Sequence, residues 1–181
     1  MRTGTNTTKK SSTPTDGISS RRNRHVAHAA AGIKRIISGG QTGVDRAALD
    51  VALKLGIACG GRCPKHRRAE DGAIDLRYPL IETEDEGYAE RTVCNVVDAD
   101  GTLILNRGIL SGGTALTRRV AQQKGRPCLV VGLPNPHAPQ IVRAWIAEHN
   151  ITVLNVAGPR ESRQNKIYDD ARRFLTDLLK P

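Results

Sequence analysis

From residue 33 onward, short runs of β-branched and apolar residues alternate with stretches that have the periodicity of amphipathic helices. We expect strands at 33–38, 57–59, 79–82, 101–105, 127–131 and 151–156. We expect helices at 44–55, 88–97, 114–124, 140–149 and 167–179, with the rest of 60–80 as loop. Strands that alternate with helices of this length form crossover units and a parallel sheet. The sequence therefore predicts a single α/β domain, a three-layer, doubly wound, mostly parallel sheet of Rossmann-like type.

Residues 1–32 differ in composition from the rest of the chain. They hold six basic residues and one acid, a net charge of +5, and they are rich in Ser and Thr with few large apolar side chains. Such a segment cannot bury enough surface to offset the entropy lost on folding. We expect a disordered basic tail at 1–32 and a folded domain at 33–181. The same composition also fits an organellar transit peptide, and the sequence leaves both alternatives open.

Composition argues against several classes of function. The chain has a net charge of +10, of which the part after residue 32 carries only +5, and aromatic residues make up 3%. Nucleic acid is therefore not the expected partner, because single-strand and RNA-binding surfaces present aromatic platforms to bases. No apolar run approaches the roughly 20 residues that span a bilayer. Four irregularly spaced cysteines fit reduced thiols in a cytoplasmic protein better than a disulfide framework or a metal site.

Doubly wound sheets bind ligands beyond the carboxyl ends of their strands, so the loops that leave the strands are the expected site. The first glycine loop, 38–43, has the sequence SGGQTG. Its glycines allow a tight turn and a close approach to a ligand. Thr42 is expected to cap the following helix, whose free amides would face an anion. In the first helical turn, Asp45 complements the helix dipole and Arg46 reaches either the anion or solvent.

Two further loops have similar chemistry. The second glycine loop, 111–114, has the sequence SGGT and precedes another helix, with Thr114 expected as cap and hydroxyl donor. The third loop, 158–162, offers Arg160, whose planar fork of donors suits a phosphate or carboxylate. In the same loop, Glu161 could orient a hydroxyl or act as a general base. The sequence does not show whether the three strands that precede these loops are neighbours.

The candidate site contains binding residues and no assigned catalytic residue or metal ligand. The first loop is neither a Walker A loop nor a G-x-G-x-x-G fingerprint, and no catalytic triad is recognisable. The charged segment 62–72 either folds over the same sheet edge or forms a solvated face, and the stripe of Tyr88, Arg91 and Asn95 faces either ligand or solvent. The candidate residues for binding a ligand or its phosphate are Gly39, Gly40, Gln41, Thr42, Gly43, Arg46, Ser111, Gly112, Gly113, Thr114, Arg160, Glu161 and Ser162.

The order of these motifs resembles that of a known family. The series consists of 38–50, 63–65, 68–72, 91–92, 95–96, 98–103, 112–114, 116–117 and 154–162. In that order the motifs are similar to those of the putative molybdenum cofactor carrier family, and the resemblance covers about residues 33–179. It leaves the basic tail unexplained.

The resemblance implies a Rossmann-like fold of the SLOG superfamily, which includes the Lonely Guy phosphoribohydrolases and other nucleotide-binding proteins. It implies a homo-oligomeric carrier of the molybdenum cofactor, a phosphorylated pterin that brings its own metal and is delivered to molybdoenzymes. The alternative is a nucleotide-processing enzyme of the phosphoribohydrolase type. The phosphoribohydrolases have a catalytic glutamate three residues after the threonine of the second glycine loop. Here Ala115, Leu116 and Thr117 follow Thr114, so that glutamate is absent and binding is favoured over hydrolysis.

Overall fold

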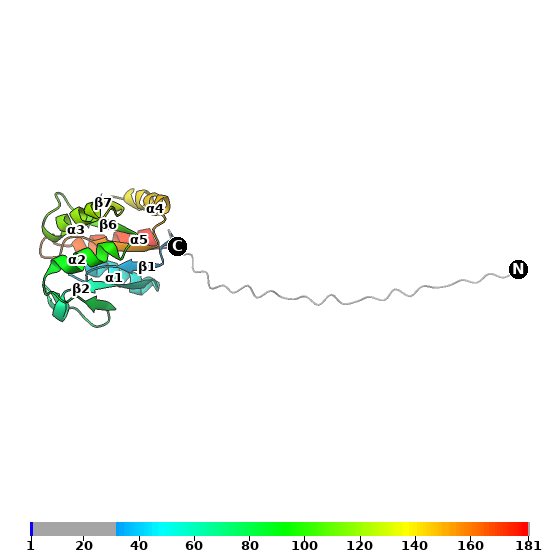
Figure 1. The fold of residues 1–181 in the computed structure, drawn as a ribbon. Coiled ribbons are helices and arrows are strands. Elements are labelled where there is room, and N and C mark those ends of the chain that lie inside the picture. Colours follow the sequence, from blue (N-terminus) through cyan, green and yellow to red (C-terminus); the bar gives the residue numbers. More distant parts are fainter. Residues whose placement is uncertain (2–31, 181) are drawn as a thin grey trace.

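The computed structural model describes residue 1 and residues 32–180. The predicted disordered tail, or transit peptide, falls almost entirely on residues outside the described part. The elements follow one another in the order β1 (Arg35–Ile37), α1 (Val44–Leu55), β2 (Ala58–Cys63), β3 (Arg68–Ala69), β4 (Gly72–Ala73), β5 (Leu80–Glu82), α2 (Tyr88–Val97), β6 (Gly101–Asn106), α3 (Gly112–Gln123), β7 (Cys128–Gly132), α4 (Ala138–Glu148), β8 (Val153–Ala157) and α5 (Ile167–Leu179) (Figure 1).

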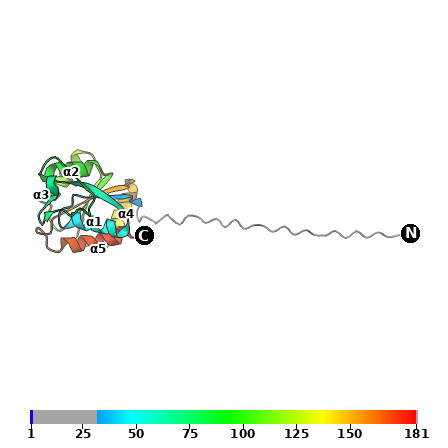
Figure 2. The ribbon, with the colours of Figure 1, turned by 90° about the horizontal axis from the view of Figure 1, so that it is seen from below.

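Six of the strands form one parallel sheet in the order β5-β2-β1-β8-β6-β7. The chain first builds outward from β1 to β5, then crosses to β6 and β7, and finally returns to place β8 in the centre. Helices α2 and α3 cover one face, and α1, α4 and α5 cover the other (Figure 2). The predicted three-layer, doubly wound α/β fold of Rossmann-like type is confirmed.

The core is built from the faces that the helical periodicity predicted. Helix α1 buries Val44, Ala47, Ala48 and Val51 against the sheet and against α5. Strand β6 is buried along its whole length, as expected for a strand covered on both faces. The buried strands and helices position the strand ends, from which the loops of the expected site leave. Among residues 32–180, no helix is long and apolar enough to cross a membrane.

The segment 60–80 is more ordered than the sequence predicted. Strand β2 continues to Cys63, because β1 pairs with its first half and β5 with its second half. Gly61 permits this pairing: its φ is +129°, and an added Cβ would lie 2.2 Å from the carbonyl oxygen of Ser38. Strands β3 and β4 then form a small antiparallel hairpin, 68–73. The expectation of a loop for the rest of 60–80 was wrong at these positions. The partner of the second half of β2 lies in a different part of the chain, and strands of two residues are too short to show an alternating pattern.

Both predicted helix caps were wrong. Helix α1 begins after Gly43, and no side chain caps it, because the Thr42 hydroxyl bonds to Glu70 instead. Helix α3 begins at Gly112, so Thr114 lies inside its first turn and Ser111 takes the N-cap position. At the other end of α1, Gly56 adopts the left-handed conformation expected of a glycine that ends a helix.

Candidate functional site

The three predicted loops leave three neighbouring strands. Strand β8 lies between β1 and β6, so the third loop lies between the first and second glycine loops at the carboxyl edge of the sheet. Together they surround a cavity of about 470 Å³. Its lining comes from all three loops and from helix α2, through Gln41, Asp45, Arg91, Ser111, Gly112, Gly113, Thr114, Thr117, Ala157, Gly158, Pro159, Arg160, Arg163 and Gln164.

The second glycine loop presents an open helix N-terminus to this cavity. Gly112 and Gly113 have no atom within 4 Å of the position that a Cβ would take, so the backbone there is fully accessible. The first turn of α3 contains no acidic side chain to neutralise the positive end of the helix dipole. Free amides at a helix N-terminus attract anions, and this terminus is accessible to one.

Three arginines line the same cavity. Arg160 and Arg163 come from the third loop and its extension, and Arg91 comes from α2. The guanidinium of Arg160 lies over the ring of Tyr88, with 5.2 Å between its carbon and the ring centroid. Asp45 is the one carboxylate in the lining, so the described cavity carries more positive than negative charge. The cavity is therefore suited to an anion.

Arg91 and Asp45 form a buried ion pair at the wall of the cavity. The Nη1 atom of Arg91 lies 2.9 Å from Oδ2 of Asp45, and the two side chains are 14% and 4% exposed. A Cβ on Gly39 would lie 1.4 Å from that Nη1, so the glycine makes room for the pair. Burial raises the pKa of Asp45, although the charge of Arg91 opposes the change. This carboxyl is the group at the site with the most perturbed surroundings.

Gln41 presents a donor that has no partner among the described residues. Its Oε1 accepts hydrogen bonds from the amides of Thr42, at 3.0 Å, and Glu70, at 2.9 Å. These two bonds fix the orientation of the carboxamide, and its Nε2 must be the free end. The residue is 5% exposed, lines the cavity, and its Nε2 finds no acceptor in the described part of the chain. A buried donor without a partner is costly, which makes a ligand acceptor at this position favourable.

Most of the first glycine loop is engaged within the protein rather than with the cavity. A Cβ on Gly40 would lie 2.4 Å from Cδ1 of Leu80, and one on Gly43 would lie 2.4 Å from the carbonyl oxygen of Pro159. Arg46 donates to the carbonyl of Gly40 and pairs with Asp71 of the hairpin. Among the predicted residues of this region, only Gln41 lines the cavity.

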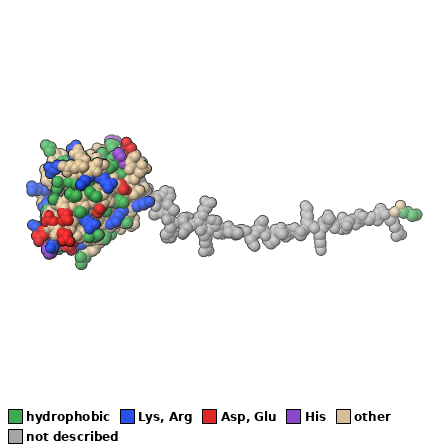
Figure 3. Space-filling model, viewed as in Figure 1, with side chains coloured by type: hydrophobic (Ala, Val, Ile, Leu, Met, Phe, Trp, Pro, Cys, Tyr) green, Lys and Arg blue, Asp and Glu red, His purple; other side chains and the backbone are tan. Residues whose placement is uncertain are grey.

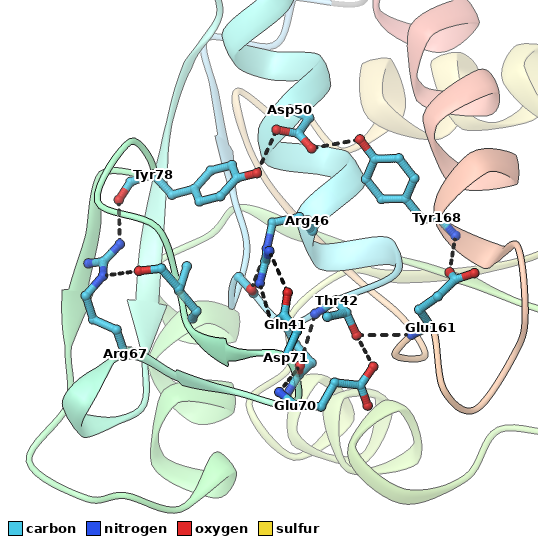
Figure 4. Close-up of polar contacts among 12 residues, drawn as sticks. Gln41, Thr42, Arg46, Asp50, Arg67, Glu70, Asp71, Tyr78, Glu161 and Tyr168 are labelled. Carbon is cyan, nitrogen blue, oxygen red and sulfur yellow. Dashed lines mark hydrogen bonds and ion pairs between the residues drawn. The ribbon is translucent and has the colours of Figure 1, made fainter.

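The third loop divides its side chains between the cavity and the fold. Arg160 lines the cavity, whereas the carboxylate of Glu161 accepts hydrogen bonds from the amides of Lys166 and Tyr168 at the start of α5. Both oxygens of Glu161 therefore bind the amides that begin α5, and the bond to the Tyr168 amide is drawn in Figure 4. Tyr168 in turn donates to Asp50 of α1, at 2.8 Å, which anchors α5 beside the loop.

The hairpin 68–73 packs over the first and third loops. Glu70 receives hydrogen bonds from the hydroxyl of Thr42 and from the amide and hydroxyl of Ser162. Arg67 anchors the base of the hairpin through the carbonyls of Ile74, Asp75, Tyr78 and Leu80 (Figure 4). The charged segment 62–72 therefore does fold over the sheet edge, one of the two alternatives that the sequence left open.

The residues of the polar stripe on α2 have different surroundings. Arg91 faces the cavity, while Asn95 holds the backbone of Arg62 through two hydrogen bonds and joins α2 to β2. Arg163, Gln164 and Thr117 line the cavity but were not predicted. The spacing of Arg160 and Arg163 in one strand-to-helix loop was a signal for the second arginine. No local signal marked the other two.

Charge elsewhere on the surface is mixed. In the view of Figure 3, acidic side chains gather at one corner and Lys and Arg side chains are scattered over the rest of the face. Among the described residues, no group of three His, Cys, Asp or Glu side chains is placed to hold a metal ion. The concentration of arginines beside an open helix terminus therefore distinguishes the cavity.

Comparison with known proteins agrees with this geometry. Residues 36–179 match the model of the Circularly permutated YpsA SLOG family. The chain belongs to this family. A crystal structure of a protein named "Putative molybdenum carrier protein", from Syntrophus aciditrophicus SB, has 46% sequence identity and a TM-score of 0.80 to this SLOG chain. The similarity covers 82% of this chain and 96% of that one, which confirms the resemblance found in the motifs. No curated protein matches this chain.

Proposed function

We propose that this chain is a carrier that binds a phosphorylated small molecule, and that the molecule is the molybdenum cofactor. The observation that carries the proposal is the meeting of an open, glycine-rich helix N-terminus with three arginines and an unpartnered buried donor in one cavity. The molybdenum carrier name of the similar crystal structure supports the choice of ligand. The metal would be held by the cofactor's own dithiolene, so the chain needs no ligand set of its own.

In this proposal, different residues of the cavity bind the phosphate and the pterin of the ligand. The terminal phosphate lies at the amides of Gly112, Gly113 and Thr114, with Arg163 and Arg160 as counter-charges. The Nε2 of Gln41 donates to an acceptor of the pterin, either a ring nitrogen or the carbonyl oxygen. This division makes Gly113 the position at which an added side chain disturbs the ligand most and the fold least.

A matched pair of valine variants tests the proposal. Gly113→Val adds a side chain in the space before α3, and Gly132→Val adds one in β7 at a position that is equally free of neighbours but outside the cavity. Native mass spectrometry of protein purified from a cofactor-producing host should show a phosphorylated pterin on the wild type and on Gly132→Val, but not on Gly113→Val. A pterin retained by all three proteins would place the ligand elsewhere. Circular dichroism confirms that both variants are folded.

The alternative function, nucleotide cleavage, is favoured by one observation. Asp45 is a buried carboxyl in the cavity wall, and its raised pKa suits a general acid. Its pairing with Arg91 and the absence of a glutamate after Thr114 favour binding instead. Incubation with nucleoside monophosphates, followed by chromatography of free base, separates the two functions. Steady release that Asp45→Asn abolishes would establish the enzyme.

We also propose a cytoplasmic homo-oligomer that delivers its cargo to molybdoenzymes, with residues 1–32 as an extension that the fold does not need. The family resemblance supports the oligomer, and the composition of the extension supports its independence. Light scattering on eluted protein should give a mass above the 19.6 kDa of one chain. Removing residues 2–31 should leave the melting temperature unchanged, and a cooperative loss of stability would show that the extension is part of the fold.

A further inference from the structure

The carboxylate of Glu70 is bound in the way that proteins bind an anionic ligand. Its two oxygens accept from the hydroxyl of Thr42, from the hydroxyl of Ser162, and from the amide of Ser162 at 3.2 Å. The Nε of Arg160 lies 3.7 Å from Oε2. Partial burial acts to raise the pKa of Glu70, but the bonds from Ser162 and Thr42 and the charge of Arg160 outweigh it, so the pKa lies below its usual value.

These donors are residues that the sequence predicted would hold the anion of a ligand. Thr42, Arg160 and Ser162 are all among the candidate ligand-binding residues, and the planar guanidinium of Arg160 suits a phosphate or carboxylate. In the structure they hold a carboxylate of the chain itself. The position they form is therefore competent to bind an anion, and the hairpin 68–73 supplies the anion that occupies it.

The occupied position is continuous with the cavity. Arg160 contacts Glu70 and also lines the cavity, and Gln41 lines the cavity while accepting from the amide of Glu70. An anion in the cavity and the carboxylate of Glu70 therefore compete for the same guanidinium. Among residues 32–180, one other ion pair holds the tip of the hairpin, that of Asp71 with Arg46, and both partners are partly exposed.

We propose that Glu70 is an internal competitor for the carried ligand: an incoming anionic group displaces its carboxylate from Arg160, Thr42 and Ser162 and releases the hairpin 68–73. This inference rests on the proposed function, because it assumes an anionic ligand in the cavity. The closed hairpin reduces the apparent affinity of the cavity by the fraction of molecules in which Arg160 is engaged.

Neutralising the competitor tests the inference, with inorganic phosphate as the probe in calorimetric titrations at constant ionic strength. Glu70→Gln and Glu70→Ala should each bind phosphate roughly tenfold more tightly than the wild type, because the charge that occupies Arg160 is gone. Asp71→Asn is the matched control: it removes the neighbouring carboxylate of the same hairpin without touching Thr42, Arg160 or Ser162, and its affinity should stay within about twofold of wild type.

Hydrogen exchange provides a second measurement on the unmodified protein. Phosphate should speed exchange of the backbone amides of 68–73, including the Glu70 amide that Gln41 holds, while amides in the core of α1 stay unchanged. Glu70→Gln with equal or weaker phosphate affinity, or slower exchange in 68–73 on adding phosphate, would overturn the inference and show that Glu70 is a brace for Arg160. In either case, wild-type binding that Gly113→Val abolishes would leave the proposed function standing. If neither wild type nor Glu70→Gln binds phosphate, both proposals fail together.

Discussion

The first and second glycine loops have similar sequences and opposite surroundings. Each has two consecutive glycines and a threonine after a parallel strand, just before α1 in the first loop and in the first turn of α3 in the second. The first is covered by the hairpin 68–73 and the third loop, and its glycines lie against Leu80 and Pro159. The second is open, with nothing within 4 Å of Gly112 or Gly113. A glycine in such a turn therefore indicates a close approach, and only the fold decides whether the approaching group is ligand or protein.

The position of each strand in the sheet explains the difference. Strand β1 has β2 and β8 as neighbours, so segments that leave both of them reach its loop. Strand β6 lies one place from the edge, and the segment after β7 continues to α4 on the opposite face of the sheet from α3. The following changes, taken from the largest expected effect to the smallest, test whether the first loop serves the fold and the second serves the ligand.

Gly43→Ala should destabilise the protein most. The φ of Gly43 is +76°, and the added Cβ would lie 2.4 Å from the carbonyl oxygen of Pro159, so the first and third loops must separate. A residue with a side chain rarely adopts this combination of φ +76° and ψ −129°, and such a strained backbone alone costs about 1–3 kcal/mol. With the displaced loop, the total should reach about 4 kcal/mol in urea unfolding. Gly113→Ala is the counterpart in the second loop and should change stability by about 1 kcal/mol or less, since its site is open. Equal losses would contradict the comparison.

Arg91→Ala should destabilise the protein by about 3 kcal/mol at neutral pH, because it leaves the buried carboxylate of Asp45 without a partner. Burial raises the pKa of Asp45 in the folded state above its unfolded value, so the folded state binds more protons. The stability of the variant must therefore fall as the pH rises from the unfolded-state pKa of Asp45 through its higher folded-state pKa. We expect a larger deficit relative to wild type at pH 8 than at pH 5.

The test of this explanation is a double variant measured by the same unfolding transitions. Adding Asp45→Asn to Arg91→Ala removes the unpaired charge and should recover part of the lost stability, together with the dependence on pH. A deficit that does not vary with pH in Arg91→Ala would mean that lost packing, rather than the isolated carboxylate, is responsible.

Arg163→Ala should weaken phosphate binding without affecting the fold. Its guanidinium lines the cavity beside the open terminus of α3, and a charge-assisted hydrogen bond contributes about 1.5–3 kcal/mol, roughly ten- to a hundredfold in affinity. Arg172→Ala, on an exposed part of α5, is the control and should bind phosphate as the wild type does. Equal affinity in the two variants would remove Arg163 from the site.

The two threonines should show the smallest effects, in different measurements. Thr42→Ala loses bonds to Glu70 and to the amide of Glu161, and should lower the free energy of unfolding by about 1 kcal/mol. Thr114→Ala lies at the open loop and should lower phosphate affinity about fivefold with little change in stability. A loss of stability in Thr114→Ala as large as that in Thr42→Ala would contradict the assignment.

The sequence predicted those features that depend on local periodicity. Helix α1 was placed exactly at Val44–Leu55, and α5 at Ile167–Leu179, because each buries one continuous apolar face. The second half of β2 was missed because its partner, β5, lies in a different part of the chain, and the hairpin 68–73 was missed because strands of two residues are too short to show an alternating pattern. The sequence also suggested that Glu161 could be a base, whereas its carboxylate accepts hydrogen bonds from the amides of Lys166 and Tyr168 at the start of α5. The approach of Thr117, Gln164 and the donor end of Gln41 to one cavity depends on the order of the strands in the sheet, which no local pattern contains.

Because β8 lies in the centre of the sheet, both the sheet and the cavity are completed late in synthesis. During synthesis, β1, β2 and β5 emerge first and β6 and β7 follow, but the slot between β1 and β6 stays empty until residues 153–157 leave the ribosome. Until then the two strand edges that flank the slot are unpaired and exposed to other nascent chains. The residues that complete the cavity, 157–164, are made immediately afterwards. A nascent chain that ends before residue 153 therefore lacks both the central strand of the sheet and the part of the cavity lining that residues 157–164 supply.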